Sequence, residues 1–202
     1  ETQNRPGTED KPIVGVGRPL PGFEVEVRDE QGLCLPEMQE GQIWIKGPSL
    51  MKEYLDDPAA TAAVMTEGWL NTGDLGFIAE TKLYVVGRSK EVLILRGRNI
   101  APHEVESALE GVVGVRRGCV AAVGIRPANS HSDELVLLIE RGANAADEPG
   151  LIEACNKAVL EKTGLRCHQV AVLEPGTLPR TSSGKIRRVE AGQRFESGTL
   201  LA

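Results

Sequence analysis

The arrangement of apolar residues changes near residue 90, and this change constrains the fold more than any other feature of the sequence. Before that point, strand-like segments such as 23–28 (FEVEVR) and 42–46 (QIWIK) follow one another without long helical segments between them. After it, the order reads strand, helix, strand, strand, helix, strand, helix. The sequence therefore predicts the α+β class, with a β-rich part followed by a small α+β unit whose sheet has about three to five strands.

The predicted boundaries follow from this change of pattern. We expect residues 1–86 to form the β-rich part, residues 87–90 to form a short connection, and residues 91–202 to form the α+β unit. Residues 1–11 are polar, and we expect them to be mobile.

Individual helices and strands are predicted from the spacing of apolar residues, from helix-capping residues and from residues that end helices. Leu151, Cys155 and Val159 recur at helical spacing, and Gly164 ends that pattern. The expected strands are 23–28, 42–46, 75–78, 83–86, 92–95, 119–125, 135–139 and 169–173, and the expected helices are 57–65, 102–111, 148–164 and 184–195.

A predicted hairpin gives the first candidate site. The segments LGFI and LYVV flank the polar AETK, and a turn near Thr81 pairs residues whose numbers sum to about 162. Asp74 and Arg88 should then face each other. Such a carboxylate can accept hydrogen bonds from the two vicinal hydroxyls of a ribose, with the guanidinium orienting it. The alternative is a plain cross-strand ion pair.

Two basic loops are the other candidates. In LRGRN, Arg96 and Arg98 flank Gly97, and the loop can either hold an anion or be a solvated hairpin tip. The segment LPRTSSGKIRR (178–188) holds four cations in a chain of formal net charge -6. Its Lys185 is placed as in phosphate-binding loops, although the first glycine of GxxxxGK[ST] is replaced by Pro179. Taken alone, a basic loop before a helix is usually a solvated surface.

Composition excludes several classes of protein. Only 3% of residues are aromatic and the net charge is negative, which argues against a nucleic-acid binder. The four cysteines lie far apart, without metal-binding spacing, so we expect no disulfide, no metal centre and a cytoplasmic location. No run of apolar residues is long enough for a membrane span, and no signal peptide is evident.

Four segments in one order carry a family resemblance. GQIWIKGPSLMKEYLDDPAAT, TEGWLNTGDLGFI, LYVVGRSKEVLILRGRNIAPHEVE and LPRTSSGKIRR together resemble the carboxyl-terminal third of the adenylate-forming enzymes. This superfamily contains acyl-CoA synthetases, peptide-synthetase adenylation domains and luciferases. The resemblance extends from about Gly15 to the end, and LRGRNIAPHEVE with VRRGCVAAVGI is most similar to the fatty acyl-AMP ligases.

The resemblance implies a two-step reaction: a fatty acid reacts with ATP to give acyl-AMP, and a phosphopantetheine thiol of a carrier protein then takes the acyl group. By motif, Asp74 would bind the ribose with help from Arg88, Lys90 would be a hinge, and Lys185 would be catalytic. The loop Arg96, Gly97 and Arg98 would lie near the acceptor. Coenzyme A as acceptor, and a non-catalytic nucleotide- or carrier-binding module, remain alternatives.

The resemblance also indicates what to expect outside these segments. The Ser/Thr/Gly-rich ATP-phosphate loop and the Tyr-Gly-x-Thr-Glu stretch of the family are not found in these residues. We therefore expect the end of a large domain followed by a small lid domain, inactive alone, with the Mg²⁺ that accompanies ATP or AMP held outside this chain. The acyl pocket would also lie outside it, so the sequence predicts no chain-length preference.

Overall fold

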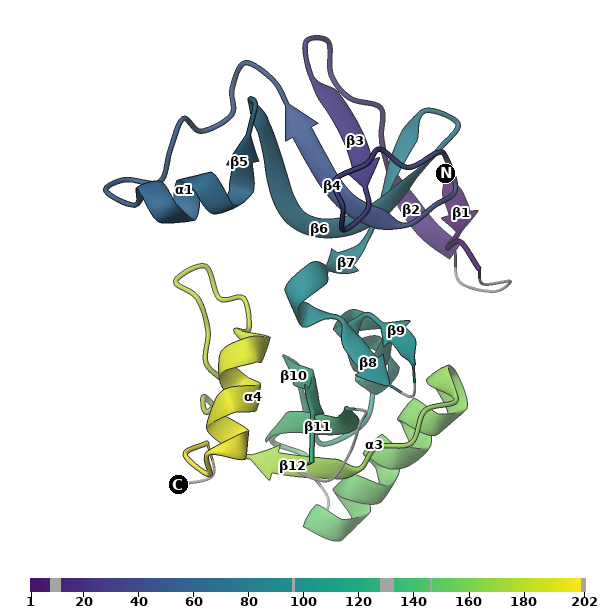
Figure 1. Ribbon diagram of the computed structural model, residues 1–202. Coiled ribbons are helices and arrows are strands. Elements are labelled where there is room, and N and C mark those ends of the chain that lie inside the picture. The colour runs from purple at the N-terminus through teal and green to yellow at the C-terminus, as the bar shows by residue number, and fades with distance from the viewer. Residues whose placement is uncertain (8–11, 96, 128–132, 146, 201–202) are drawn as a thin grey trace. The chain divides into compact units, whose positions relative to one another are not determined.

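The computed structural model describes residues 1–7, 12–95, 97–127, 133–145 and 147–200 (Figure 1). The chain divides into two compact units, Glu1–Lys90 and Glu91–Ala202, here called the amino-terminal and carboxyl-terminal units. The first is built mainly of strands and the second of both strands and helices. This mixture confirms the predicted α+β class.

The amino-terminal unit is an antiparallel sheet. Within the described residues it has seven strands in the order β1-β2-β7-β6-β4-β3, with β5 paired to β6. One helix, α1 (Pro58–Val64), precedes β5 (Figure 1). The strands are β1 (Thr2–Asn4), β2 (Pro12–Gly17), β3 (Glu24–Arg28), β4 (Gly41–Lys46), β5 (Met65–Thr66), β6 (Trp69–Ala79) and β7 (Lys82–Arg88).

The start of the chain differs from the prediction. Residues 1–7 are not a mobile tail, because Thr2–Asn4 form β1 and pair with β2. Arg5 is only 7% exposed, and its guanidinium donates two hydrogen bonds, of 2.8 and 2.9 Å, to the carboxylate of Glu40. The polar composition misled the prediction because the partner lies 35 residues away. Residues 8–11 lie outside the described residues.

Aromatic side chains fix the pairing of β6 with β7. The rings of Phe77 and Tyr84 stack with centroids 5.0 Å apart, and both are buried with Ala79 and Val86. Phe77 and Tyr84 are also directly opposite each other in the ladder. Because a slip of one residue would move these rings to the other face of the sheet, the register of the hairpin is strongly specified.

The carboxyl-terminal unit is a three-stranded sheet covered by helices on both faces (Figure 1). Strand β10 (Val115–Ile125) is antiparallel to β11 (Glu134–Arg141), and β11 is parallel to β12 (Gln169–Leu173). The remaining elements are a 3-10 turn at the unit boundary (Ser89–Glu91), the hairpin β8 (Leu93–Leu95) and β9 (Arg98–Ile100), α2 (Pro102–Glu106), a 3-10 turn (Ser107–Leu109), α3 (Glu148–Thr163) and α4 (Arg188–Glu196).

Strand β11 forms the centre of this unit. Leu137 and Ile139 pack in a core cluster with residues of α2 and α3, whereas Val136 and Leu138 pack in a second cluster with Ala191 of α4. Both faces of the strand are therefore buried, which explains why the sequence shows a continuous apolar run there instead of an alternating pattern.

Two predicted helices are shorter than expected. The helix expected at 102–111 ends at Glu106 and continues as a 3-10 turn, and the helix expected at 184–195 begins only at Arg188. The second difference has a local cause: Gly184 has a φ of 86°, and Arg180 and Ile186 form a β-bridge across the preceding loop. No helix in the described part of the chain has both the length and the apolar composition that crossing a membrane requires.

Candidate functional site

Asp74 and Arg88 are directly opposite each other at the open end of the β6–β7 hairpin, as the sequence predicted. The Arg88 Nε lies 3.0 Å from Asp74 Oδ1, and the two side chains are 63% and 30% exposed, respectively. The pair is therefore open to solvent on its outer side. Among the described residues, no side chain or backbone group pairs with the second carboxylate oxygen of Asp74.

A β-bulge produces this pairing. Between the turn and Gly76, each residue of β6 faces the partner that a simple two-residue turn dictates, ending with Gly76 opposite Val85. The register then shifts, so that Leu75 faces Gly87 and Val86 is an extra residue on β7. Without this extra residue Asp74 would face Gly87. The bulge therefore brings the guanidinium of Arg88 to the carboxylate.

The backbone before Asp74 is also held in place. The pairing of β6 with β4 is interrupted around Thr72, and Gly73 has a φ of 73°. The Thr72 hydroxyl donates to the Ile43 carbonyl at 3.0 Å and accepts from the Asp74 N–H at 3.1 Å. The Ser89 hydroxyl donates to the Gly73 carbonyl at 3.0 Å. These bonds orient the carboxylate before any ligand binds.

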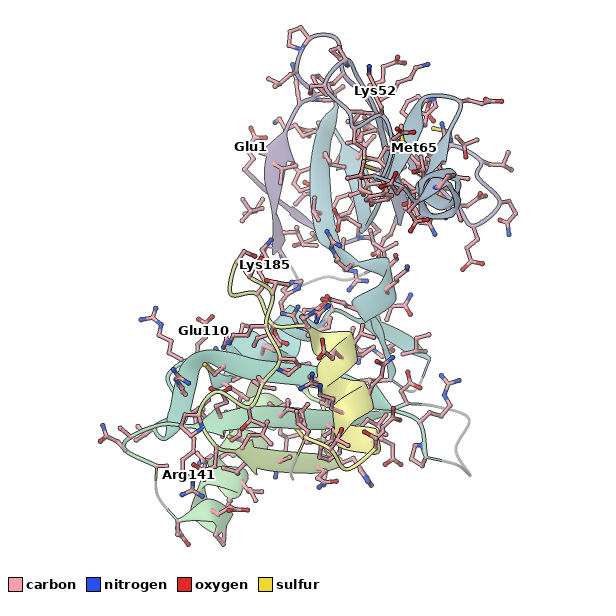
Figure 2. All side chains as sticks on the ribbon, turned by 90° about the vertical axis from the view of Figure 1, so that its left-hand side faces the viewer. Glu1, Lys52, Met65, Glu110, Arg141 and Lys185 are labelled. Carbon is pink, nitrogen blue, oxygen red and sulfur yellow. The ribbon has the colours of Figure 1, made fainter. Side chains whose placement is uncertain are left out.

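The loop that carries Lys185 is a closed turn, and it is not the flexible glycine- and serine-rich segment that its composition suggests. The Thr181 N–H donates to the Lys185 carbonyl at 2.8 Å, and the Gly184 N–H donates to the Thr181 carbonyl at 2.9 Å. Arg180 donates to the Gly184 carbonyl at 2.7 Å. The Lys185 side chain is exposed on this loop ahead of α4 (Figure 2).

A buried carboxylate anchors the amino-terminal side of this loop. Glu140 on β11 is completely buried and accepts hydrogen bonds from the Leu178 N–H at 3.0 Å and from Arg116 at 2.8 Å. Burial raises the pKa of Glu140, but hydrogen bonds from the backbone of Gly176 and Leu178, the Cys119 thiol and Arg116 outweigh it and leave the pKa below its ordinary value. Glu140 is therefore ionised and holds the chain that leads to Lys185.

Arg188 anchors the other side of the loop. Its guanidinium makes two hydrogen bonds to Glu106, of 2.7 and 2.8 Å, and a third to Glu91 at 2.8 Å. The hydrogen bond to Glu106 is the main reason that the pKa of Arg188 is raised. Because Glu91 directly follows Lys90, this network connects the Lys185 loop to the first residue of the carboxyl-terminal unit.

The remaining predicted site residues are Lys90 and the loop Arg96, Gly97 and Arg98. Gly97, with a φ of 76°, forms the turn between β8 and β9, and Arg98 begins β9 with an exposed side chain. Arg96 lies outside the described residues. Lys90 is exposed in the 3-10 turn at the end of the amino-terminal unit. Asp74 and Arg88 thus belong to one unit, and Lys185, Gly97 and Arg98 belong to the other.

The carboxyl-terminal unit also contains a cavity of about 1100 Å³, which was not predicted from the sequence. It lies between the Lys185 loop, the residues around 106–118, and the segment 142–144. The only sequence signal was the combination of closely spaced glycines and arginines in GVVGVRRG (111–118).

The described residues contain no group of three or more His, Cys, Asp and Glu side chains arranged to hold a metal ion. All four cysteines are free. Burial raises the pKa of Cys155 and of Cys167 to about 11, so both remain protonated thiols at neutral pH and are poor nucleophiles.

Comparisons with known proteins now define the class. Residues 2–55 match the family described as "AMP-binding enzyme". A protein of Caulobacter vibrioides named "Putative acyl-CoA synthetase" is 37% identical over 91% of this chain, and an aspulvinone E synthetase of Aspergillus terreus is 33% identical over 92%. Among solved structures, a fatty acyl-adenylate ligase from a study of E. coli and L. pneumophila enzymes has a TM-score of 0.80 at 34% identity over 95% of this chain.

A second structure, McyG A-PCP complexed with phenylalanyl-adenylate, has a TM-score of 0.87 at 29% identity and covers 94% of this chain. The chain therefore belongs to the adenylate-forming AMP-binding enzymes, and the resemblance drawn from its motifs is confirmed. It spans about a third of the Caulobacter protein (32%) and of both solved structures (34%), and about a fifth of the Aspergillus protein (21%).

The anchoring role of Glu140 gives a pH-dependent prediction. Replacing the buried carboxylate in Glu140→Gln should lower the free energy of unfolding of the carboxyl-terminal unit by about 2–3 kcal/mol at neutral pH. Because the pKa of Glu140 is lowered from 4.5, its contribution is present above pH 4.5 and is lost as the pH falls through the folded-state pKa. The difference between the two proteins should therefore shrink in acid.

Urea unfolding followed by far-ultraviolet circular dichroism measures this difference. Trp44 and Trp69 both lie in the amino-terminal unit, so their fluorescence gives an internal control that should not change. Glu148→Gln is the matched variant, since Glu148 is exposed and only 3.3 Å from Arg141 in a surface pair. Equal effects of the two substitutions, or a loss in Glu140→Gln that does not depend on pH, would contradict the anchoring role.

Proposed function

We propose that this chain is part of an ATP-dependent ligase that converts a fatty acid to acyl-AMP and passes the acyl group to the phosphopantetheine thiol of a carrier protein. The observation that carries the proposal is the Asp74–Arg88 pair, whose carboxylate is fixed by a bulge and is open to solvent. A carboxylate that is fixed and open to solvent can accept hydrogen bonds from two adjacent ribose hydroxyls. A purely structural ion pair would not need a β-bulge in order to form.

The first half-reaction forms a mixed anhydride. A carboxylate oxygen of the fatty acid attacks the α-phosphorus of ATP, the bond between this phosphorus and the bridging oxygen breaks, and pyrophosphate leaves. Two anions must approach each other in this step, so a cation that contacts the α-phosphate in the transition state lowers the barrier. In the proposal Lys185 supplies this cation, and its exposed ammonium on a closed, anchored loop supports that role.

The second half-reaction moves the acyl group. A thiolate attacks the carbonyl carbon of acyl-AMP, the bond to the phosphate oxygen breaks, and AMP leaves. The proposal places the loop Arg96, Gly97 and Arg98 beside this acceptor, where the positive charges would attract the phosphate of phosphopantetheine. It places the Mg²⁺ that accompanies ATP on residues outside this chain, and the reaction in the cytoplasm.

Coenzyme A is the second candidate acceptor. The identity to the Caulobacter protein named as an acyl-CoA synthetase favours it, whereas the similarity to a fatty acyl-adenylate ligase structure favours the carrier protein. Both acceptors end in the same phosphopantetheine thiol, so the chemistry of the second step does not separate them.

Product analysis of the full-length protein that carries this sequence tests the proposal. We expect incubation with ATP and a fatty acid to give acyl-AMP, and addition of a phosphopantetheinylated carrier protein to give its acyl thioester. With coenzyme A as the acceptor, the yield should be much lower. Preferential formation of acyl-coenzyme A would establish the second candidate, and absence of acyl-AMP with every acid tested would contradict both.

A hinge at Lys90 is a separate part of the proposal. Lys90 is exposed at the boundary of the two units, where a change of a few backbone angles would reorient one unit against the other. Lys90→Pro fixes φ near about −65° and should trap one orientation in the full-length protein. We expect thioester formation to fall much more than acyl-AMP formation, as measured on the two half-reactions separately. Equal losses in both would indicate misfolding and would remove the hinge from the account.

A further inference from the structure

The cavity of the carboxyl-terminal unit has an unusual charge. Although the whole chain has a formal net charge of -6, the cavity lining is strongly positive. Its charged lining residues are five cations and two carboxylates: Arg116, Arg117, Arg180, Lys185, Arg188, Glu106 and Glu110. Glu110 and Lys185 are both labelled in Figure 2. Bringing like charges together around one space costs free energy, which an anionic ligand would offset.

Three of these cations are already bound within the protein. Arg116 donates to the buried Glu140, and Arg188 donates to Glu106 and Glu91. Arg180 donates to two backbone carbonyls, those of Gly184 and Gly118, at 2.7 and 2.9 Å. Backbone carbonyls do not neutralise the guanidinium, so Arg180 is held in a fixed position with its charge intact.

The other two cations, Arg117 and Lys185, have no acidic partner among the described residues, and both side chains are exposed. They come from different walls of the cavity: Arg117 from the start of β10, and Lys185 from the loop before α4. Arg117 presents a planar fork of donors that fits a phosphate through two hydrogen bonds, and Lys185 adds a point charge.

Glycines leave parts of the cavity wall open. Gly111, Gly118 and Gly184 line the cavity with positive φ values of 93°, 67° and 86°, and a Cβ built at any of them would meet no atom within 4 Å. The space beside the backbone at these three glycines is therefore open. A ligand with several oxygen atoms can therefore come close to the main chain.

We propose that this cavity is a binding site for a diphosphate group, with Arg117 and Lys185 as its direct ligands and Arg180 as a fixed third cation. Glu110 offsets one of these three positive charges, and an excess of two remains in the lining. A diphosphate can place one phosphate on Arg117 and the other on Lys185, which a single phosphate or a carboxylate cannot do. Arg117 has no role in the acyl-transfer function proposed above, and the binding site does not require that function. Inorganic pyrophosphate, released from ATP, and the diphosphate of coenzyme A are the two sources of this chemistry.

Isothermal titration of the 202-residue chain with inorganic pyrophosphate tests the site. We expect saturable binding that weakens as salt is added. Arg117→Ala and Lys185→Ala should each weaken this binding about tenfold or more, because each removes a charged hydrogen-bond donor. Arg166→Ala is the matched control, since Arg166 is an exposed arginine of the same unit that does not line the cavity, and it should leave the affinity unchanged. Circular dichroism of each variant checks that the fold is kept.

Further titrations identify the source of the ligand. AMP, which has one phosphate, should bind much more weakly than pyrophosphate. Tighter binding of pyrophosphate than of coenzyme A would assign the site to the pyrophosphate of ATP. The reverse order, lost in Arg117→Ala, would assign it to the acceptor and would give Lys185 a second role in thiol transfer. No saturable binding of either compound up to about 10 mM, or an equal loss in the Arg166 control, would overturn the proposal. Since no turnover is measured, this result is independent of whether the full-length protein makes acyl-AMP.

Discussion

The geometry of the Lys185 loop depends on one buried carboxylate. Glu140 lies near the end of β11 and is fully removed from solvent. It accepts hydrogen bonds from the backbone N–H of Leu178 and from the guanidinium of Arg116. A charge in this position is tolerated only because its oxygens are satisfied. On the far side of the loop, Arg188 anchors the chain through hydrogen bonds to Glu106 and Glu91. Because the loop is anchored at both ends, the Lys185 ammonium needs little rearrangement to contact a developing negative charge.

In the amino-terminal unit the corresponding constraint is the extra residue on β7. Val86 faces the core beside Phe77 and Tyr84, and by occupying one position it turns the rest of the strand so that Arg88 meets Asp74. The core therefore determines the position of the candidate ribose site. Each unit thus builds its candidate site residues on its own core, as the proposed reorientation of the two units would require.

Local patterns in the sequence predicted much of this. The apolar run of β11, the carboxyl-terminal cap of α3 at Gly164 and the pairing of Asp74 with Arg88 are all encoded within short segments. The pairing was predicted with a register uncertain by a residue or two, and the bulge at Val86 determines which residue faces Asp74. What could not be predicted depends on partners distant in the sequence: Arg5 with Glu40, the Glu140 anchor of a loop 38 residues away, and the cavity. Composition alone made residues 1–11 look mobile.

The central claim is that the Lys185 ammonium acts in adenylation and not in thioester formation. The most direct measurement is the rate of each half-reaction in the full-length protein with Lys185→Ala, using acyl-AMP supplied ready-made for the second, and with the melting temperature shown to be unchanged. The account predicts that adenylation falls by about two to three orders of magnitude, the usual loss for one partner of a transition-state charge, while transfer to the thiol changes little. If transfer falls as far as adenylation, Lys185 has a structural role and the account is wrong.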